Sequence, residues 1–273
     1  MAFRFYRHKN WCKNTPIFVP FLYPQNIFAA SAAEVTSDNI VGYQKIDLAQ
    51  GWNMIGMQFV DIGGGELPMG TAAILDSSMA GFDDEGTYIT EIHVWNGVGY
   101  NIYGWSGTSG TEYLEDPSYD NQWLNDQLEP LEVETFPKAQ GVWLKAGSKG
   151  SVTIAGEVPT DKSVTVELNV GWNMVANPFP GDVKISSFGM LSDDMAGFDD
   201  EGNYITEMHV WNGVGYNIYG WSGTSGTEYL EDPSYDNKWL NDQLEIPEDN
   251  VVLPYGRGVW IKAGSSGSIT FTK

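Results

Sequence analysis

The sequence predicts an all-β protein built from two tandem modules, each of them a β-sandwich or a small barrel. Three observations predict this fold. Apolar and polar side chains alternate with a period of two rather than 3.6 in most of the chain. The 273 residues include 32 glycines, which suits many short strands joined by tight turns. A long segment also occurs twice, which divides the chain into two units of similar size.

The repeated segment covers residues 79–129 and returns at residues 195–245. Three positions differ between the copies: Thr87 against Asn203, Ile92 against Met208, and Gln122 against Lys238. The flanking motifs GWNM and GVW occur at 51 and 141 and again at 171 and 258. These repeats predict module 1 at residues 33–158 and module 2 at residues 159–273. Recent recombination or functional constraint could keep the copies alike, and we favour recombination because loops and core positions are preserved equally.

The first strands follow from local patterns. Residues 41–48 alternate polar and apolar side chains and predict a half-buried strand. Gly51 then turns the chain into a second strand, and residues 142–145 and 151–154 predict a closing pair of strands. Only the short segments 71–78 and 185–191 are expected to form helical turns.

The clearest local signal is a hairpin. Asn96-Gly97 lies between two strand-like runs and predicts a two-residue type I′ turn, because both residues tolerate positive φ. In that register Trp95 faces Val98 and His93 faces Tyr100. The opposite side, which is more apolar, is expected to face the core and carries Tyr88, Ile92, Val94, Tyr103 and Trp105.

The polar and aromatic side of this hairpin is the main candidate site. It carries Glu91, His93, Trp95 and Tyr100, and the second copy carries Glu207, His209, Trp211 and Tyr216. Aromatic rings could stack on a sugar while the histidine and glutamate bond to its hydroxyl groups. The alternative is that a neighbouring strand or loop covers this side.

Two acidic turns are weaker candidates for a metal site. They contain Asp83, Asp84 and Glu85 in the first copy and Asp199, Asp200 and Glu201 in the second. Carboxylate oxygens on a turn are ligands that calcium accepts, but the full D-x-D-x-D-G spacing is absent. An exposed turn that ends in glycine is the alternative. No other cofactor is expected.

Composition excludes several classes of protein. With 36 acidic and 14 basic residues the net charge is −22, which disfavours nucleic-acid binding. The single cysteine, Cys12, excludes a disulfide scaffold and a zinc site made of several thiolates. No apolar run approaches the roughly 18 residues of a membrane span. The catalytic motifs HExxH, the P-loop and GxGxxG are absent, so no enzyme is expected, although a glycosidase pair of carboxylates is left open.

Residues 1–32 have the order of a secretory signal peptide. Basic residues between Arg4 and Lys13 precede an apolar patch at 17–23 and the small residues Ala30-Ser31-Ala32. The segment predicts export to the cell surface or the medium. A disordered N-terminal extension is the alternative.

Several motifs together resemble a known group of proteins. The NIVGY run at 39–43, the GWNMI run at 51–55, the VWNG run at 94–97 and the GVWL run at 141–144 are similar to secreted tandem β-modules of Verrucomicrobia- and Lentisphaerae-type bacteria. The resemblance covers residues 39–273 as two copies, and the second copy departs from it at residues 161–163. It implies export and an all-β module, with no known catalytic residues.

Two functions follow as expectations. The first is a secreted or cell-surface, non-catalytic structural or adhesive module. The alternative is a carbohydrate-binding module that uses the aromatic hairpin side. The expected partners are surface glycans or other surface proteins, while the ligand and the oligomeric state are not set by the sequence.

Overall fold

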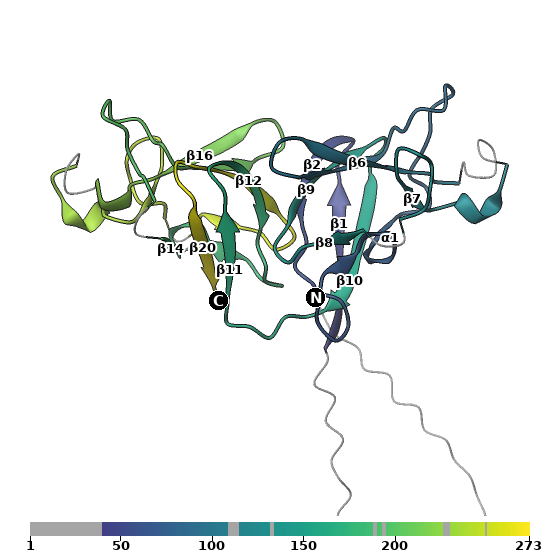
Figure 1. The fold of residues 1–273 in the computed structure, drawn as a ribbon, viewed down its shortest axis with the longest axis horizontal. Helices are drawn as coiled ribbons and strands as arrows, with labels where there is room; N and C mark the ends of the chain where they lie inside the picture. Colours follow the sequence, from purple (N-terminus) through teal and green to yellow (C-terminus); the bar gives the residue numbers. More distant parts are fainter. Residues whose placement is uncertain are drawn as a thin grey trace, which may run out of the picture. The chain divides into compact units, whose positions relative to one another are not determined.

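Antiparallel β-sheets make up nearly all of the regular structure, which confirms the all-β prediction (Figure 1). The computed structural model describes residues 40–108, 115–131, 134–187, 190–192, 195–225, 230–248 and 250–273. Residues 38–273 form one compact unit. The predicted signal peptide lies outside the described residues. No helix within the described ranges is both long and apolar enough to cross a membrane.

The first repeat, residues 40–158, contains a five-stranded sheet, a three-stranded sheet and one small strand pair. The five-stranded sheet has the order β2 (Gly51–Gly56), β9 (Gly141–Ala146), β5 (Glu91–Trp95), β6 (Tyr100–Trp105) and β7 (Trp123–Leu124). The three-stranded sheet consists of β1 (Val41–Leu48), β10 (Gly150–Glu157) and β4 (Ala73–Leu75). The pair is β3 (Leu67–Pro68) with β8 (Thr135–Phe136), and short turns form α1 (Met69–Ala72) and η1 (Pro117–Tyr119).

The second repeat, residues 159–273, has the same sheets in the same order. Its five-stranded sheet runs β12 (Gly171–Ala176), β19 (Gly258–Ala263), β15 (Glu207–Trp211), β16 (Tyr216–Trp221) and β17 (Trp239–Leu240). Its three-stranded sheet is β11 (Ser163–Leu168), β20 (Gly267–Thr272) and β14 (Met190–Leu191), and its pair is β13 (Val183–Lys184) with β18 (Val252–Leu253). The 3₁₀ turns are η2 (Ile185–Ser187), η3 (Gly223–Ser225) and η4 (Pro233–Tyr235).

Each repeat encloses its own core between its two larger sheets. In the first repeat, Leu48 and Ile154 of the three-stranded sheet share one buried cluster with Ile92 and Trp123 of the five-stranded sheet. The Trp123 indole N–H donates to the carbonyl of Ala73 at 2.7 Å, so the ring is buried with its polar atom satisfied. The second repeat has a separate cluster of the same kind. Two sheets around one core make each repeat a β-sandwich.

The GWN motif forms the turn that leads into β2 and β12. Gly51 has φ +93°, a conformation that suits glycine. The buried Asn53 side chain accepts from the Ala49 amide at 3.0 Å and donates to the Ala49 carbonyl at 2.8 Å. Gly171 and Asn173 repeat this arrangement in the second copy. The motif is therefore a turn device, and it leaves the tryptophan between glycine and asparagine half exposed.

The predicted closing pair of strands is wrong. The strands β9 and β10 exist where expected, but β9 pairs with β2 and β5 whereas β10 pairs with β1 and β4. The turn between them therefore carries the chain from one sheet to the other. Both edges of each strand are occupied by strands from elsewhere in the chain, which a local pattern does not reveal. The helical turns are also shorter than expected, because β4 occupies Ala73–Leu75 of the first segment, and the second segment has the turn η2 at its start and β14 at its end.

The hairpin of β5 and β6 has a longer loop than predicted. Trp95 pairs with Tyr100 rather than Val98, so the loop holds four residues. The Asn96 amide donates to the Gly99 carbonyl at 3.0 Å, and the Asn96 side-chain oxygen accepts from the Val98 and Gly99 amides. This side-chain turn stabilises a loop that the two-residue rule does not describe. Because strand side chains alternate with a period of two, the two-residue shift leaves the predicted faces unchanged.

Candidate functional site

Strand order gathers aromatic side chains on the outer face of each five-stranded sheet. Side chains directly opposite each other on neighbouring strands share a face. In the first repeat, one row holds Trp52, Lys145 and Glu91, and the next holds Met54, Trp143, His93 and Ile102. Trp95 and Tyr100 form the last row. The second repeat has the corresponding rows, in which Trp172, Met174, Trp260, His209, Trp211 and Tyr216 take these places.

The two aromatic faces meet each other between the repeats. Trp95 lies edge-on against Trp260, with ring centroids 5.3 Å apart. Trp143 lies edge-on against Trp211 at 5.5 Å. The Trp95 indole N–H also donates to the Trp172 carbonyl at 2.9 Å. Part of the predicted binding face is therefore covered by the other repeat, so Trp95 packs in this joint rather than standing free for a sugar.

Glycines allow the two backbones to approach at this joint. The Gly56 amide donates to the Gly256 carbonyl at 2.9 Å, and the Ala176 amide donates to the Ala139 carbonyl at 2.7 Å. Gly56 and Ala176 hold the same position in the two repeats, and so do Ala139 and Gly256. The two bonds are therefore the same contact with the repeats exchanged. A Cβ on Gly141 would lie 2.7 Å from the Val175 carbonyl oxygen, closer than real contacts allow. The small residues therefore set how tightly the repeats dock.

The joint leaves an open pocket of about 380 Å³ lined by rings from both repeats. Its lining, which we call the aromatic pocket, is Trp52, His93, Tyr100 and Trp143 from the first repeat with Trp211 and Tyr216 from the second. Trp52 is 45% exposed and is the most accessible of its tryptophans. The predicted residues His93, Tyr100, Trp211 and Tyr216 are thus brought together, although they come from two copies of the hairpin.

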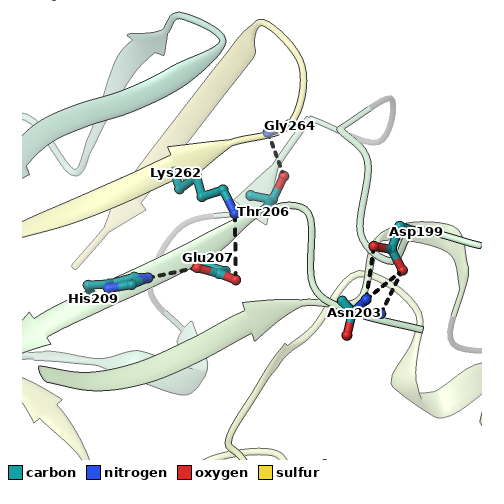
Figure 2. A network of polar contacts seen from close by, with 7 residues as sticks. All are labelled: Asp199, Asn203, Thr206, Glu207, His209, Lys262 and Gly264. Atoms are coloured by element: carbon teal, nitrogen blue, oxygen red, sulfur yellow. Dashed lines mark hydrogen bonds and ion pairs between the residues drawn. The ribbon is translucent and has the colours of Figure 1, made fainter. Parts of the chain in front are cut away.

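Polar groups edge the pocket beside Trp52. The Glu91 carboxylate lies 2.9 Å from His93 Nε2 and 3.4 Å from Lys145 Nζ. The Trp52 ring contacts the His93 ring edge-on at 4.8 Å. Figure 2 shows the same arrangement in the second repeat, where Glu207 lies 2.8 Å from His209 and 3.8 Å from Lys262. Burial, with a smaller effect of the nearby Tyr216, raises the pKa of Tyr100, so its hydroxyl stays neutral at physiological pH.

The sequence pattern of the hairpin did not identify Trp52 and Trp143 as site residues, nor their counterparts Trp172 and Trp260. They lie on β2 and β9, or on β12 and β19, far from the hairpin in sequence. The available signal was the period-two spacing of Trp52 with Met54 and of Trp143 with Lys145, which places each pair on one face. Only the pairing of β9 with both β2 and β5 brings those faces together.

The acidic turns use their first aspartate to hold the turn itself. The Asp83 carboxylate accepts from the Glu85 and Thr87 amides at 3.0 and 2.8 Å. Asp199 accepts from the Glu201 amide. It also accepts from the amide and the side chain of Asn203 (Figure 2). Within the described ranges, no group of three or more His, Cys, Asp or Glu side chains is placed to hold a metal ion. Calcium binding at Asp83, Asp84 and Glu85, or at Asp199, Asp200 and Glu201, stays a prediction.

No protein family matches this chain, and no curated protein or solved structure matches it either. The functional argument therefore depends on the pocket between the repeats and on the chemistry of the residues that line it.

Proposed function

We propose that this chain is a non-catalytic adhesive module of the cell surface that binds carbohydrate in the aromatic pocket. The observation that carries the proposal is the exposed Trp52 ring, which stands in a pocket walled by five further rings and edged by charged groups. Its export and surface location rest on the N-terminal residues alone.

The chemistry of a sugar fits this combination of side chains. A pyranose has an apolar face of C–H groups and a rim of hydroxyl groups. The apolar face can stack on an indole, because aromatic rings offer a large rigid apolar surface. The hydroxyl groups can bond to Glu91, Lys145 and the neutral Tyr100 hydroxyl, which supply acceptors and donors.

The pocket suits binding better than hydrolysis. Glycoside hydrolysis uses a pair of carboxyl groups at a defined separation across the bond that breaks. Of the six described residues that line the pocket, none carries a carboxyl group. Glu91 stands at its edge and already contacts His93 and Lys145. Linked repeats also favour binding modules, since a second weak site raises avidity.

A purely structural role is the second candidate. It is favoured by the ring contacts of Trp95 with Trp260 and of Trp143 with Trp211, which use part of the aromatic face to join the repeats. In that case the remaining pocket would have no ligand.

Glycan-array binding of the full chain distinguishes the two candidates. We expect reproducible binding to one class of glycan, in calcium and in EDTA alike. Trp52→Ala should weaken it by about tenfold or more, which is about 1.4 kcal/mol of lost contact. Trp172→Ala is the matched control, since Trp172 holds the same position in the second repeat, is 41% exposed and lies outside this pocket.

Three results would contradict the proposal. An array without any binding in either buffer would favour the purely structural role. Binding that Trp52→Ala and Trp172→Ala weaken equally would place the ligand elsewhere. Binding that requires calcium would favour a ligand site at the acidic turns over one in the aromatic pocket.

A further inference from the structure

A second pocket, of about 450 Å³, adjoins the aromatic pocket. Its lining includes Asp47, Trp52 and Asn53 from the first repeat and Trp211, Asn212 and Arg257 from the second. Trp52 and Trp211 line both pockets. A ligand that stacks on Trp52 can therefore extend from the rings into this second pocket, which we call the arginine pocket.

Arg257 is an unusual residue in this chain. It is the only arginine after residue 7, in a protein with a net charge of −22. Its side chain is partly buried. Within the described ranges no hydrogen bond or ion pair reaches its guanidinium group, and Asp47 of the same pocket forms no ion pair with it. A partly buried guanidinium has five donors in a planar fork, the geometry that a carboxylate matches with two parallel bonds.

The first repeat shows what this position needs for structure alone. Gln140 precedes Gly141 there, as Arg257 precedes Gly258. The Gln140 side-chain amide donates to the Gly141 carbonyl at 2.7 Å and to the Met174 carbonyl at 3.2 Å. Glutamine therefore completes the joint by local hydrogen bonds on that side. The positive charge of Arg257 is not required for docking the repeats, so it is available for another role.

From these observations we infer that the ligand is a glycan with a carboxylated sugar, whose carboxylate pairs with Arg257 while the sugar stacks on Trp52. The inference rests on the proposed carbohydrate binding and adds the chemical class of the ligand. One carboxylate suits the site better than a polyanion, because the acidic surface repels repeated charges. That repulsion is screened beyond about 8 Å at physiological salt, so a local pair with Arg257 can still form.

The test compares glycans that differ by one carboxylated sugar, such as lactose with sialyllactose and glucosyl with glucuronyl disaccharides. Calorimetry with the full chain should show about tenfold tighter binding of the acidic member of one pair, within the range of a charge-assisted bidentate bond. Arg257→Gln copies the first repeat and should abolish that preference while neutral binding remains. Asp47→Asn should strengthen binding of the acidic member about twofold, because a like charge leaves the pocket.

Lys149→Gln serves as the control, because it removes one exposed positive charge outside both pockets and should leave the preference unchanged. Equal affinity for both members of every pair would overturn the inference, and so would a preference that Arg257→Gln does not reduce. In both cases, if Trp52→Ala abolished binding of the neutral glycan, the proposed carbohydrate binding would still be supported. The absence of binding to any glycan would instead contradict the proposed function itself.

Discussion

Trp143 of the first repeat meets Trp211 of the second edge-on, with ring centroids 5.5 Å apart and ring planes at 81°. Trp260 and Trp95 make the same contact with the repeats exchanged, at 5.3 Å and 81°. Contacts that exchange in this way are characteristic of two-fold symmetric dimers. The two repeats thus pack like a symmetric pair within one chain, and the aromatic pocket exists only because of this packing.

The first prediction concerns the strength of the tryptophan joint. Trp211→Ala should lower the free energy of unfolding by about 2–3 kcal/mol. This is less than the loss for a fully buried tryptophan, because the Trp211 ring is partly exposed. In a double-mutant cycle with Trp143→Ala, the two changes should couple by about 0.5–1.5 kcal/mol, the usual value for an aromatic pair. Urea denaturation measures both quantities. Val214→Ala is the control, since Val214 is 93% exposed in the same hairpin, and strictly additive losses would contradict the coupling.

The second prediction concerns the close approach at Gly56. A Cβ at this position would lie 2.5 Å from the Ala176 Cβ and 2.9 Å from the Arg257 carbonyl oxygen. Gly56→Ala should therefore force the repeats apart and cost about 1–3 kcal/mol of unfolding free energy. Adding Ala176→Gly should recover part of the loss, because it removes one of the two clashes. Gly99→Ala has no atom within 4 Å of the new Cβ and should be neutral, so equal losses for Gly56→Ala and Gly99→Ala would contradict this account.

The third prediction concerns pH at the second acidic turn. Hydrogen bonds from the Asn203 amide and side chain hold the pKa of Asp199 below its ordinary value of 3.8. A carboxyl group whose pKa is lowered by folding stabilises the folded turn above the unfolded pKa and loses this effect as the pH falls through the folded pKa. Asn203→Thr copies Thr87 of the first repeat, so it keeps the backbone amide bond and removes the side-chain amide that donates to Asp199 at 3.1 Å. The pKa of Asp199 should rise part of the way, as NMR titration of the carboxyl carbons would show.

Asp232 provides an internal reference for that titration. Its pKa is lowered by the Ser234 amide and hydroxyl, which the Asn203 change does not touch. An unchanged Asp199 pKa in Asn203→Thr would mean that the amides alone set it.

The fourth prediction compares two half-buried tyrosines. Burial raises the pKa of both Tyr88 and Tyr204 to about 12. A raised tyrosine pKa stabilises the fold fully below the unfolded value of 10, and the effect is lost as the pH rises through about 12. Phenolate absorbance should therefore show two late ionisations near pH 12, together with falling stability above pH 10.

Replacing each tyrosine with phenylalanine separates the effect of burial on stability from the effect of the hydroxyl hydrogen bond. The Tyr204 hydroxyl donates to the Asn241 carbonyl at 3.3 Å, whereas the buried Tyr88 hydroxyl has no partner within the described ranges. Tyr204→Phe should cost about 0.5–1.5 kcal/mol, and Tyr88→Phe should be neutral or stabilising. Equal losses in thermal or urea unfolding would contradict this difference.

The sequence alone was sufficient for the fold class, for the repeated segment and for the faces of the hairpin. Strand side chains alternate with a period of two, so Glu91, His93 and Trp95 share one face whatever the loop length. Tyr100 stays on that face because the four-residue loop at Asn96 shifts the register by two residues, an even number. These properties depend on residues close together in the chain, where local pattern is informative.

Only the tertiary structure decided what that face contacts. The partners of Trp95 lie in the other repeat, and Trp52 and Trp143 reach the pocket through strands far from the hairpin in sequence. Strand order and docking come from burying apolar surface between distant segments, with Gly56 and Gly141 allowing the close approach. Such contacts leave no periodic signal in the chain. The hairpin face was therefore predictable, whereas its division between a joint and an open pocket was not.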